Sequence, residues 1–372
     1  MQRARSEDPD CRVYRLTESG PELTQLLPSG VSPEGEVAIP ARDLLVTANE
    51  VDLVEDGGAR AHVMLYALED AEAPDYPSIA LAEDAELLGW GALSGLAADP
   101  DAPGRLHAVS DSVYDAEPRI FEIDATATPA RIIRAIDVTR GGVPARKLDL
   151  EGIAPDGEGG FWLASEGDRA KLVPHALIHV DAEGAIEDEI ALPDELAAAE
   201  TRFGAEGVAV IDGRIWVAVQ REWGDDPKGE AKLLAYDPEA ETWGGVRYPL
   251  DTAPEGGWIG LSEITAAGGY AWVIERDNRI GAAARVKQIT RVALSDMEPA
   301  PLDGDLPLVT KEVVRDLLPD LAATGGYVVD KVEGFAIDAA GEAYAVTDND
   351  GVDDSSGETH FLRLGPVGAK PE

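Results

Sequence analysis

Short apolar runs, divided by turns rich in Gly, Asp and Pro, recur along almost the whole chain. From residue 151 the run IAPD is followed by the turn DGEGG, the apolar run FWLASE, a polar loop, ALIHVD, the turn AEG and IEDEIALP. Such runs are typical of short β-strands joined as an antiparallel meander. Apolar spacing compatible with a helix occurs at residues 192–203 and 311–325, which we expect to connect strands.

The meander recurs six times, and each copy opens with a small motif that carries an acid or a serine. A second polar motif follows 12 to 17 residues later, at the end of a strong apolar run. The fifth copy is ambiguous by one residue, because either Ser262 or Glu263 can open it. The intervals between copies are 60, 57, 55, 57 and 70 residues, a period typical of repeat architectures. The copies begin at Glu34, Ser94, Glu151, Glu206, Glu263 and Glu333.

Six four-stranded meanders predict an all-β fold, a six-bladed β-propeller formed by a single domain over residues 1–372, with residues 1–20 as a loose N-terminal extension. The last copy supplies only three strands, EGFAID, EAYAVTD and HFLRLG. The strand-like segment PELTQLLP precedes the first copy. We therefore expect this N-terminal strand to complete the last blade and close the ring, which removes open sheet edges.

The glycine that follows most of the opening acids has a structural interpretation. Innermost strands of a propeller crowd around the axis, and glycine permits a close approach of neighbouring backbones. This interpretation leaves the acids unexplained. Carboxylates that face one narrow channel repel each other and are costly to desolvate unless cations neutralise them.

Composition restricts the partners. The chain has 72 acidic and 31 basic residues and a formal net charge of -41, which opposes binding to nucleic acids and to anionic membranes. The 44% hydrophobic fraction is enough for a folded core. One cysteine, Cys11, allows neither an internal disulfide nor a cysteine-based zinc site. We expect a monomer.

The N-terminal stretch MQRARSEDPDC lacks an apolar segment, and the sequence has no run of 18 apolar residues, so it predicts neither a signal peptide nor a transmembrane segment. On these residues alone, a cytoplasmic location stays open.

The two sets of motifs are expected at the same mouth of the propeller, because successive strands of a meander are antiparallel. The second motifs are Glu50, Asp111, Glu166, Gln220 to Glu222, Glu275 with Arg276, and Asp348 to Asp350. Carboxylate and carbonyl oxygens without paired histidines or cysteines suit Ca²⁺, or Mg²⁺, better than zinc. The predicted metal ligands are Glu34, Glu50, Glu151, Glu166, Glu206, Glu263, Glu333, Asp348 and Asp350.

Two arginines stand at matching positions beside these acids. Arg221 ends VAVQR and Arg276 ends VIER. A guanidinium binds phosphate or carboxylate bidentately, so each arginine either contacts an anionic substrate or pairs with channel carboxylates. Together with Ser94, which replaces an acid in the second copy, they make the ring asymmetric. We predict that Arg221, Arg276 and Ser94 bind substrate and that Glu206 and both arginines take part in catalysis.

The segments LDLEGIAPDGEGGFWLASEGD, RFGAEGVAVIDGRIWVAVQRE, GLSEITAAGGYAWVIERDNR and DKVEGFAIDAAGEAYAVTDND resemble the phytase-like family, often labelled "esterase-like activity of phytase". The resemblance covers roughly residues 90 to 365 through its EG, ER and DN signatures. Members of that family are β-propellers, usually exported from bacteria, so the resemblance implies a periplasmic or secreted protein. The first copy also resembles the SPEG…ANE segment of propellers in bacterial surface proteins.

The resemblance implies a Ca²⁺-dependent hydrolase of phosphate esters that acts on a small anionic substrate at an acidic axial site. By matching motif, it implies Glu151, Glu206, Glu333 and Asp348 as metal ligands and Arg276 as a phosphate contact. Two alternatives remain open: a lactonase or carboxylic-ester hydrolase of the gluconolactonase type, and a non-catalytic binding or surface propeller with a structural cation.

Overall fold

The protein is almost entirely β in the computed structural model, which describes residues 10–30, 32–52, 54, 60–70, 76–82, 85, 88–112, 118–167, 173–200, 203–326, 328–349 and 359–366. Two short helices occur in this part of the chain, α1 (Asp194–Ala199) and α2 (Leu318–Ala322). No helix among the described residues has the length and apolar character that crossing a membrane requires.

Both helices lie within segments with helix-compatible spacing, but the second segment is only partly helical. Its first residues, Lys311–Asp316, form strand β25, which pairs with β23 (Lys287–Ala293). The adjacent β-branched Val313 and Val314 favour a strand, and pairing with β23 satisfies backbone groups that the predicted helix was to satisfy internally.

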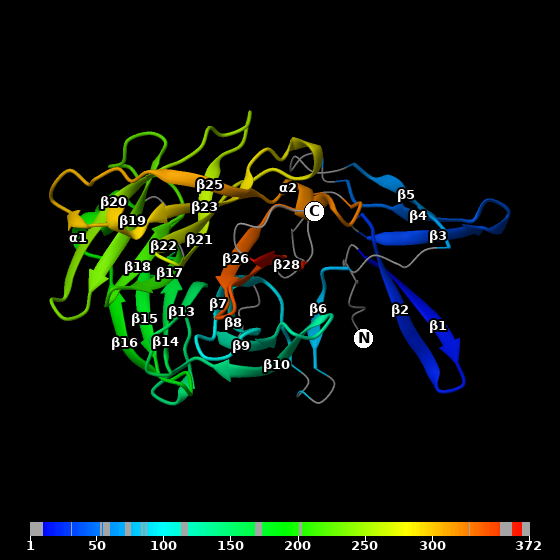
Figure 1. Ribbon diagram of the computed structural model, residues 1–372, viewed down its shortest axis with the longest axis horizontal. Helices are drawn as coiled ribbons and strands as arrows, with labels where there is room; N and C mark the ends of the chain where they lie inside the picture. Colours follow the sequence, from blue (N-terminus) through cyan, green and yellow to red (C-terminus); the bar gives the residue numbers. More distant parts are fainter. Residues whose placement is uncertain are drawn as a thin grey trace.

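Five antiparallel sheets make up the main body (Figure 1). Their strands follow one another along the chain, apart from β6, which pairs in parallel with β10, and β24, which extends the third sheet. Tight turns join the strands, as at Asp212 and Gly213, where φ of 50° and 79° fits a two-residue hairpin turn.

The first sheet holds β7 (Leu93–Ala98), β8 (Arg105–Ser110), β9 (Arg119–Asp124), β10 (Ala130–Asp137) and β6 (Ile79–Leu81). The second holds β13 (Leu150–Pro155), β14 (Phe161–Ser165), β15 (Ala176–Val180) and β16 (Ile186–Ala191). The third holds β17 (Ala205–Ile211), β18 (Arg214–Val219), β19 (Glu230–Asp237), β20 (Thr242–Pro249) and β24 (Ala300–Pro301).

The fourth sheet holds β21 (Ile259–Ala267), β22 (Tyr270–Asp277), β23 and β25, and the fifth holds β26 (Val332–Ile337), β27 (Glu342–Thr347) and β28 (Phe361–Pro366). The remaining short elements are β11 (Thr139–Arg140), β12 (Val143–Pro144) and the 3-10 turns at Pro40–Arg42, Gly281–Ala283 and Leu294–Asp296.

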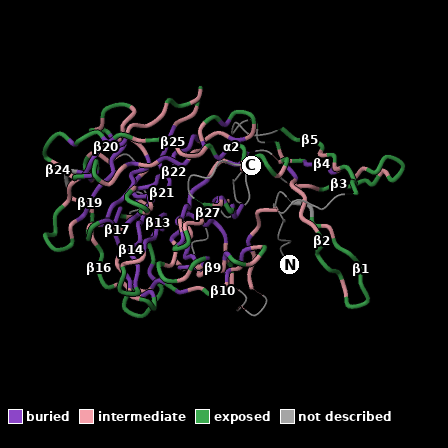
Figure 2. The backbone as a smooth tube through the Cα atoms, in the orientation of Figure 1, coloured by how far each residue is buried: buried purple, intermediate pink, exposed green. Residues whose placement is uncertain are grey.

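These five sheets close into a ring. Their first strands, β7, β13, β17, β21 and β26, contact each other in this order, and β26 packs against β7. Five hydrophobic clusters fill the junctions, and each cluster is shared by two neighbouring sheets, including the last and the first. Figure 2 shows the buried backbone concentrated in this body. The arrangement is propeller-like, with one core layer per junction.

The expected crowding at the repeated glycines is confirmed. A Cβ on Gly152 or Gly207 would lie closer than 3.0 Å to backbone atoms of the next inner strand, and one on Gly334 would lie 2.6 Å from the carbonyl oxygen of Ser94. Inner strands therefore approach at distances that only glycine permits.

The N-terminal region lies beside this ring. It contains the hairpin of β1 (Asp10–Thr17) and β2 (Gly20–Pro28) and a sheet of β3 (Pro33–Ile39), β4 (Leu44–Asn49) and β5 (His62–Ala67) (Figure 1). A Cβ on Gly35 of β3 would meet only Ala48, at an ordinary 3.5 Å.

Two expectations are therefore corrected. The prediction of six blades is not confirmed, because β26 packs directly against β7 and leaves no place between them for β3. The prediction that PELTQLLP completes the last blade is wrong, since this segment belongs to β2 and pairs with β1. Pairing with a neighbour across a tight turn needs less loop closure than pairing with a strand at the far end of the chain.

Candidate functional site

Each inner strand carries an irregularity at its opening motif. The register with the second strand shifts there in all five sheets of the ring, which leaves an extra residue at one mouth. In the fifth copy the shift includes Ser262, so Ser262 and not Glu263 takes the opening position. The equivalent residues, all buried, are Ser94, Glu151, Glu206, Ser262 and Glu333.

Three glutamates of this set influence each other. Burial, followed by the charges of Glu206, Asp149 and Glu333, raises the pKa of Glu151 well above its usual value. Burial, then Glu166 and Glu333, raises the pKa of Glu206 in the same direction. The mouth therefore concentrates negative charge that water does not screen.

Arg276 neutralises part of this charge. Its Nε donates to Ser262 Oγ at 2.9 Å, its Nη1 to Asp330 at 3.3 Å and its Nη2 to Glu333. Although burial lowers it, the carboxylates of Glu333, Asp330 and Glu206 raise the pKa of Arg276 above its usual range. Of the two roles considered for this arginine, the structure supports pairing with channel carboxylates.

A second cation stands near the same side. Lys331 Nζ lies 3.1 Å from the carboxylate of Asp348, a predicted metal ligand that is itself buried. The neighbouring Asn349 caps β7 by accepting the N–H of Ala92 at 2.8 Å. The other residue predicted from this motif, Asp350, lies outside the described residues.

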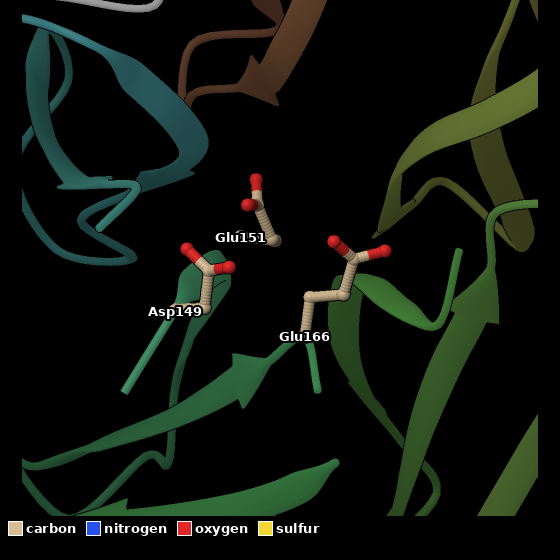
Figure 3. A group of neighbouring side chains, drawn as sticks. All are labelled: Asp149, Glu151 and Glu166. Atoms are coloured by element: carbon tan, nitrogen blue, oxygen red, sulfur yellow. The ribbon is translucent and has the colours of Figure 1, made fainter. Parts of the chain in front are cut away.

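The opposite side of the mouth holds three acids in one group, Asp149, Glu151 and Glu166 (Figure 3). One carboxylate oxygen of each lies within 4.8 Å of the others. Glu166 accepts the N–H of Gly204 at 2.9 Å, and Asp149 accepts that of Ser112 at 2.9 Å, which fixes both side chains. Asp149 was not predicted, although it stands two residues before Glu151 in the motif DLEG.

Two buried oxygens at the mouth lack a hydrogen-bond partner among the described residues, Ser94 Oγ and Gln220 Oε1. The Gln220 amide nitrogen donates to Glu206 Oε1 at 2.7 Å, which leaves its oxygen as the unsatisfied end. Buried polar atoms without a partner are uncommon, and a bound ion or water is one of the arrangements that satisfies them. Acceptor oxygens beside mutually repelling carboxylates fit a hard cation such as Ca²⁺ or Mg²⁺.

Glu263 has a different role. It occupies the position where the other inner strands carry glycine, and a Cβ on Gly207 would lie 2.5 Å from its Oε1. Its carboxylate accepts N–H groups of Leu96 and Ile264, both at 3.0 Å, and of two further inner strands at Val208 and Phe335. Burial raises the pKa of Glu263, and the four N–H donors oppose this. The contacts bind four strands together at the axis, and we leave Glu263 out of the candidate cation site.

The other end of the axis is hollow. A cavity of about 380 Å³ opens there, lined mainly by small and apolar residues at the far ends of the inner strands, among them Ala97, Pro155, Val210, Ala267 and Ile337. Glu263 lies between this cavity and the acidic mouth, because it stands between the two sets of residues along its strand.

The remaining predicted residues lie apart from one another. Glu34 and Glu50 are exposed in and after the strands of the N-terminal sheet, outside the ring. Arg221 is half-buried, with its guanidinium carbon 4.7 Å from the ring centres of both Phe203 and Trp258. Burial lowers the pKa of Arg221. The structure thus brings together Glu151, Glu166, Glu206 and Glu333. It adds Asp149, which the sequence had not singled out, and Gln220, which belongs to a second motif but was not predicted as a ligand.

Comparison with known sequences gives one family match. The sequence model described as "Phytase-like: Esterase-like activity of phytase" matches residues 88–351, which is more than half of the chain. No curated protein shows a significant match.

Several solved structures are similar. Glutaminyl cyclase from Myxococcus xanthus is 11% identical with a TM-score of 0.41, over 74% of this chain and 92% of that one. The major allergen Mala s 1 from Malassezia sympodialis is 14% identical with a TM-score of 0.39, over 97% and 96%. A putative oxidoreductase (glucose dehydrogenase) from Thermus thermophilus is 12% identical with a TM-score of 0.37, over 89% and 96%. At these scores, no conclusion about function is drawn from them.

Proposed function

The chain belongs to the phytase-like family, and from this premise we propose that it is a metal-dependent hydrolase of phosphate esters that acts at the acidic mouth of the ring. We further propose that the ring is a five-bladed β-propeller and that Ca²⁺ is the physiological cation. The family description names an esterase-like activity, and the mouth gathers carboxylate oxygens that could hold a divalent cation for it.

One observation carries the proposal: two unsatisfied buried oxygens, Ser94 Oγ and Gln220 Oε1, accompany glutamates that repel each other. Repulsion and burial make the ionised carboxylates costly, and a divalent cation bound between them would offset both costs. Asp149, Glu151 and Glu166 would hold it, with the two neutral oxygens as further ligands. The chemistry that a divalent cation supplies when bound is polarisation of the ester and a lower pKa for an attacking water.

Glu206 is the residue best suited to move a proton. Burial, and then the charges of Glu166 and Glu333, raise its pKa above the usual value, the direction that favours a carboxyl group able to hold a proton. The amide of Gln220 fixes its Oε1 at 2.7 Å. Arg276 and Lys331 hold the carboxylates of Glu333 and Asp348 on the other side of the mouth, so positive charge there offsets part of the field that an anionic ester meets.

The test is a panel of phosphate monoesters and diesters, assayed with added Ca²⁺, with added Mg²⁺ and after EGTA. We expect turnover that EGTA abolishes and Ca²⁺ restores. Glu206→Gln should lower kcat by about 100-fold or more, the usual contribution of an acid–base group. Glu34→Gln is the matched control, because Glu34 opens the same motif but is exposed outside the ring. Absence of turnover on the whole panel would refute phosphoesterase activity.

The hydrogen bonds of Arg276 favour a second candidate, hydrolysis of lactones or other carboxylic esters. Its guanidinium is committed to Ser262, Asp330 and Glu333, which reduces the positive charge available to a phosphate. A panel of lactones and aryl acetates under the same conditions separates the two chemistries. A cation that raises the melting temperature without activity on either panel would point instead to a binding protein.

A further inference from the structure

Arg221 is placed differently from the other arginine of the mouth. Its guanidinium lies in a corner formed by Phe203 and Trp258, whose ring centres are 5.9 Å apart and whose planes are inclined by 46°. Contact with two aromatic faces fixes the plane of a guanidinium and leaves its N–H edge directed away from the rings.

No carboxylate or other acceptor among the described residues hydrogen-bonds to Arg221. Its guanidinium contacts the two rings, and the neighbouring Glu222 acts on it through its charge alone. This is unexpected in a chain with 72 acidic residues. A half-buried guanidinium loses hydration, and protein or ligand oxygens normally replace it.

The same molecule contains a second arginine that lies against two aromatic rings, and this one has a carboxylate partner. Arg291 lies 4.3 Å from the ring centre of Tyr270 and 5.6 Å from that of Trp272, again against two aromatic rings. There the guanidinium edge is occupied by Glu312, which accepts from Nε at 2.8 Å. At Arg221 the equivalent acceptor is not supplied by the described part of the chain.

Arg221 adjoins the proposed catalytic mouth. The preceding residue, Gln220, bonds Glu206, and Trp258 lies 5.4 Å from the guanidinium carbon of Arg276 as well as beside Arg221. Trp258 therefore lies near both an arginine that is bonded to Ser262 and two carboxylates and an arginine that has no such partner among the described residues.

We propose that Arg221 is the oxyanion receptor of this mouth and that Phe203 and Trp258 are its positioning residues. The ligand group it recognises is a phosphate or carboxylate that takes the place Glu312 has at Arg291. The inference rests on the proposed function for its substrate class: esters that carry an anionic group able to reach Arg221 while the ester itself lies at the carboxylate cluster. Neutral esters should bind more weakly, because they have no anionic group to contact Arg221.

The proposal is tested by binding, without turnover. Inorganic phosphate, and acetate in a separate arm, are titrated against the full chain in EGTA by calorimetry, with Trp fluorescence as a second readout. We expect Arg221→Met to weaken phosphate binding at least tenfold and Arg221→Lys to weaken it less, because lysine keeps the charge and loses the fork. Trp258→Leu should weaken it about threefold by releasing the guanidinium. Comparison of the two arms identifies which oxyanion is preferred.

Arg291→Met is the matched control, because it removes a guanidinium that also lies against two aromatic rings but is already bonded to Glu312. The inference is overturned if Arg221→Met binds phosphate as tightly as the unmodified chain, or if Arg291→Met loses as much. Circular dichroism and melting temperatures confirm that each variant is folded. If phosphate binding depends on Arg221 but the chain has no hydrolytic activity, this inference is supported and the proposed function is refuted. If the chain hydrolyses an anionic ester and Arg221→Met leaves KM unchanged, the proposed function is supported and this inference is refuted.

Discussion

The closure of the ring by five inner strands leads to a prediction that compares two glycines of the same motif. Gly207 and Gly35 both follow the glutamate that opens a copy, and neither has a φ in the left-handed region. Alanine therefore causes no backbone strain at either position, and only the surroundings differ. A Cβ at position 207 would collide with backbone atoms of Glu263 and Ile264, whereas one at position 35 would meet only Ala48 at 3.5 Å.

We expect Gly207→Ala to destabilise the protein by about 3 kcal/mol, the upper part of the range for overpacking, because the obstructing atoms belong to a backbone that cannot rotate away. Gly35→Ala should change stability by less than about 0.5 kcal/mol. For a chain of 372 residues, about 3 kcal/mol corresponds to a fall in melting temperature of roughly 4 °C.

Urea unfolding, followed by Trp fluorescence, measures both free energies, and the m-value shows whether the unfolding reaction has stayed the same. Equal losses in the two variants would place β3 in a crowded ring and refute the five-strand closure. A Gly207→Ala variant as stable as the unmodified chain would refute the packing distances themselves.

Three further outcomes are expected. The pKa values of Glu151 and Glu206 are raised in the folded state, so the free energy of unfolding should fall as the pH rises above their ordinary value of 4.5. Ca²⁺ should therefore raise the melting temperature more at pH 8 than at pH 5. Equal increases at both pH values would contradict a cation site among these acids. Glu263→Gln should cost about 2–4 kcal/mol in urea unfolding, because one amide oxygen replaces a carboxylate that serves four N–H donors, and an unchanged midpoint would contradict it. Arg276→Met should cost about 3–5 kcal/mol, measured in the same way, because it leaves Glu333 as a buried charge without its partner; a loss below about 1 kcal/mol would exclude this pairing as a structural contribution.

Much of the fold follows from local patterning. The strands, their order in each sheet and the crowded glycines were predictable because apolar runs, two-residue turns and repeated Gly report on short-range geometry. The number of strands in the ring was not. Copy one has the same EG motif and nearly the same spacing as the others, and its β3 even carries the same register shift. Closure depends on how far each sheet twists around the axis, which no single repeat encodes.

The candidate site was also predictable only in part. The convergence of Glu151, Glu206 and Glu333 follows from the repeat, but the different surroundings of the two arginines do not. Arg276 and Arg221 hold matching sequence positions, and the difference arises from Ser262 and Glu333 on one side and from Phe203 and Trp258 on the other. Phe203 lies far from Trp258 along the chain and precedes its own repeat, so spacing gave no signal for this corner.

Glu263 divides the axis of the ring. Its carboxylate accepts N–H groups from four inner strands and lies between the acidic mouth and the cavity at the far end, which places the two ends on either side of it. On the proposed function, substrate therefore enters and product leaves by the acidic mouth. If Arg221 receives oxyanions as proposed, a released anion competes with the next ester for this arginine, and competitive product inhibition follows.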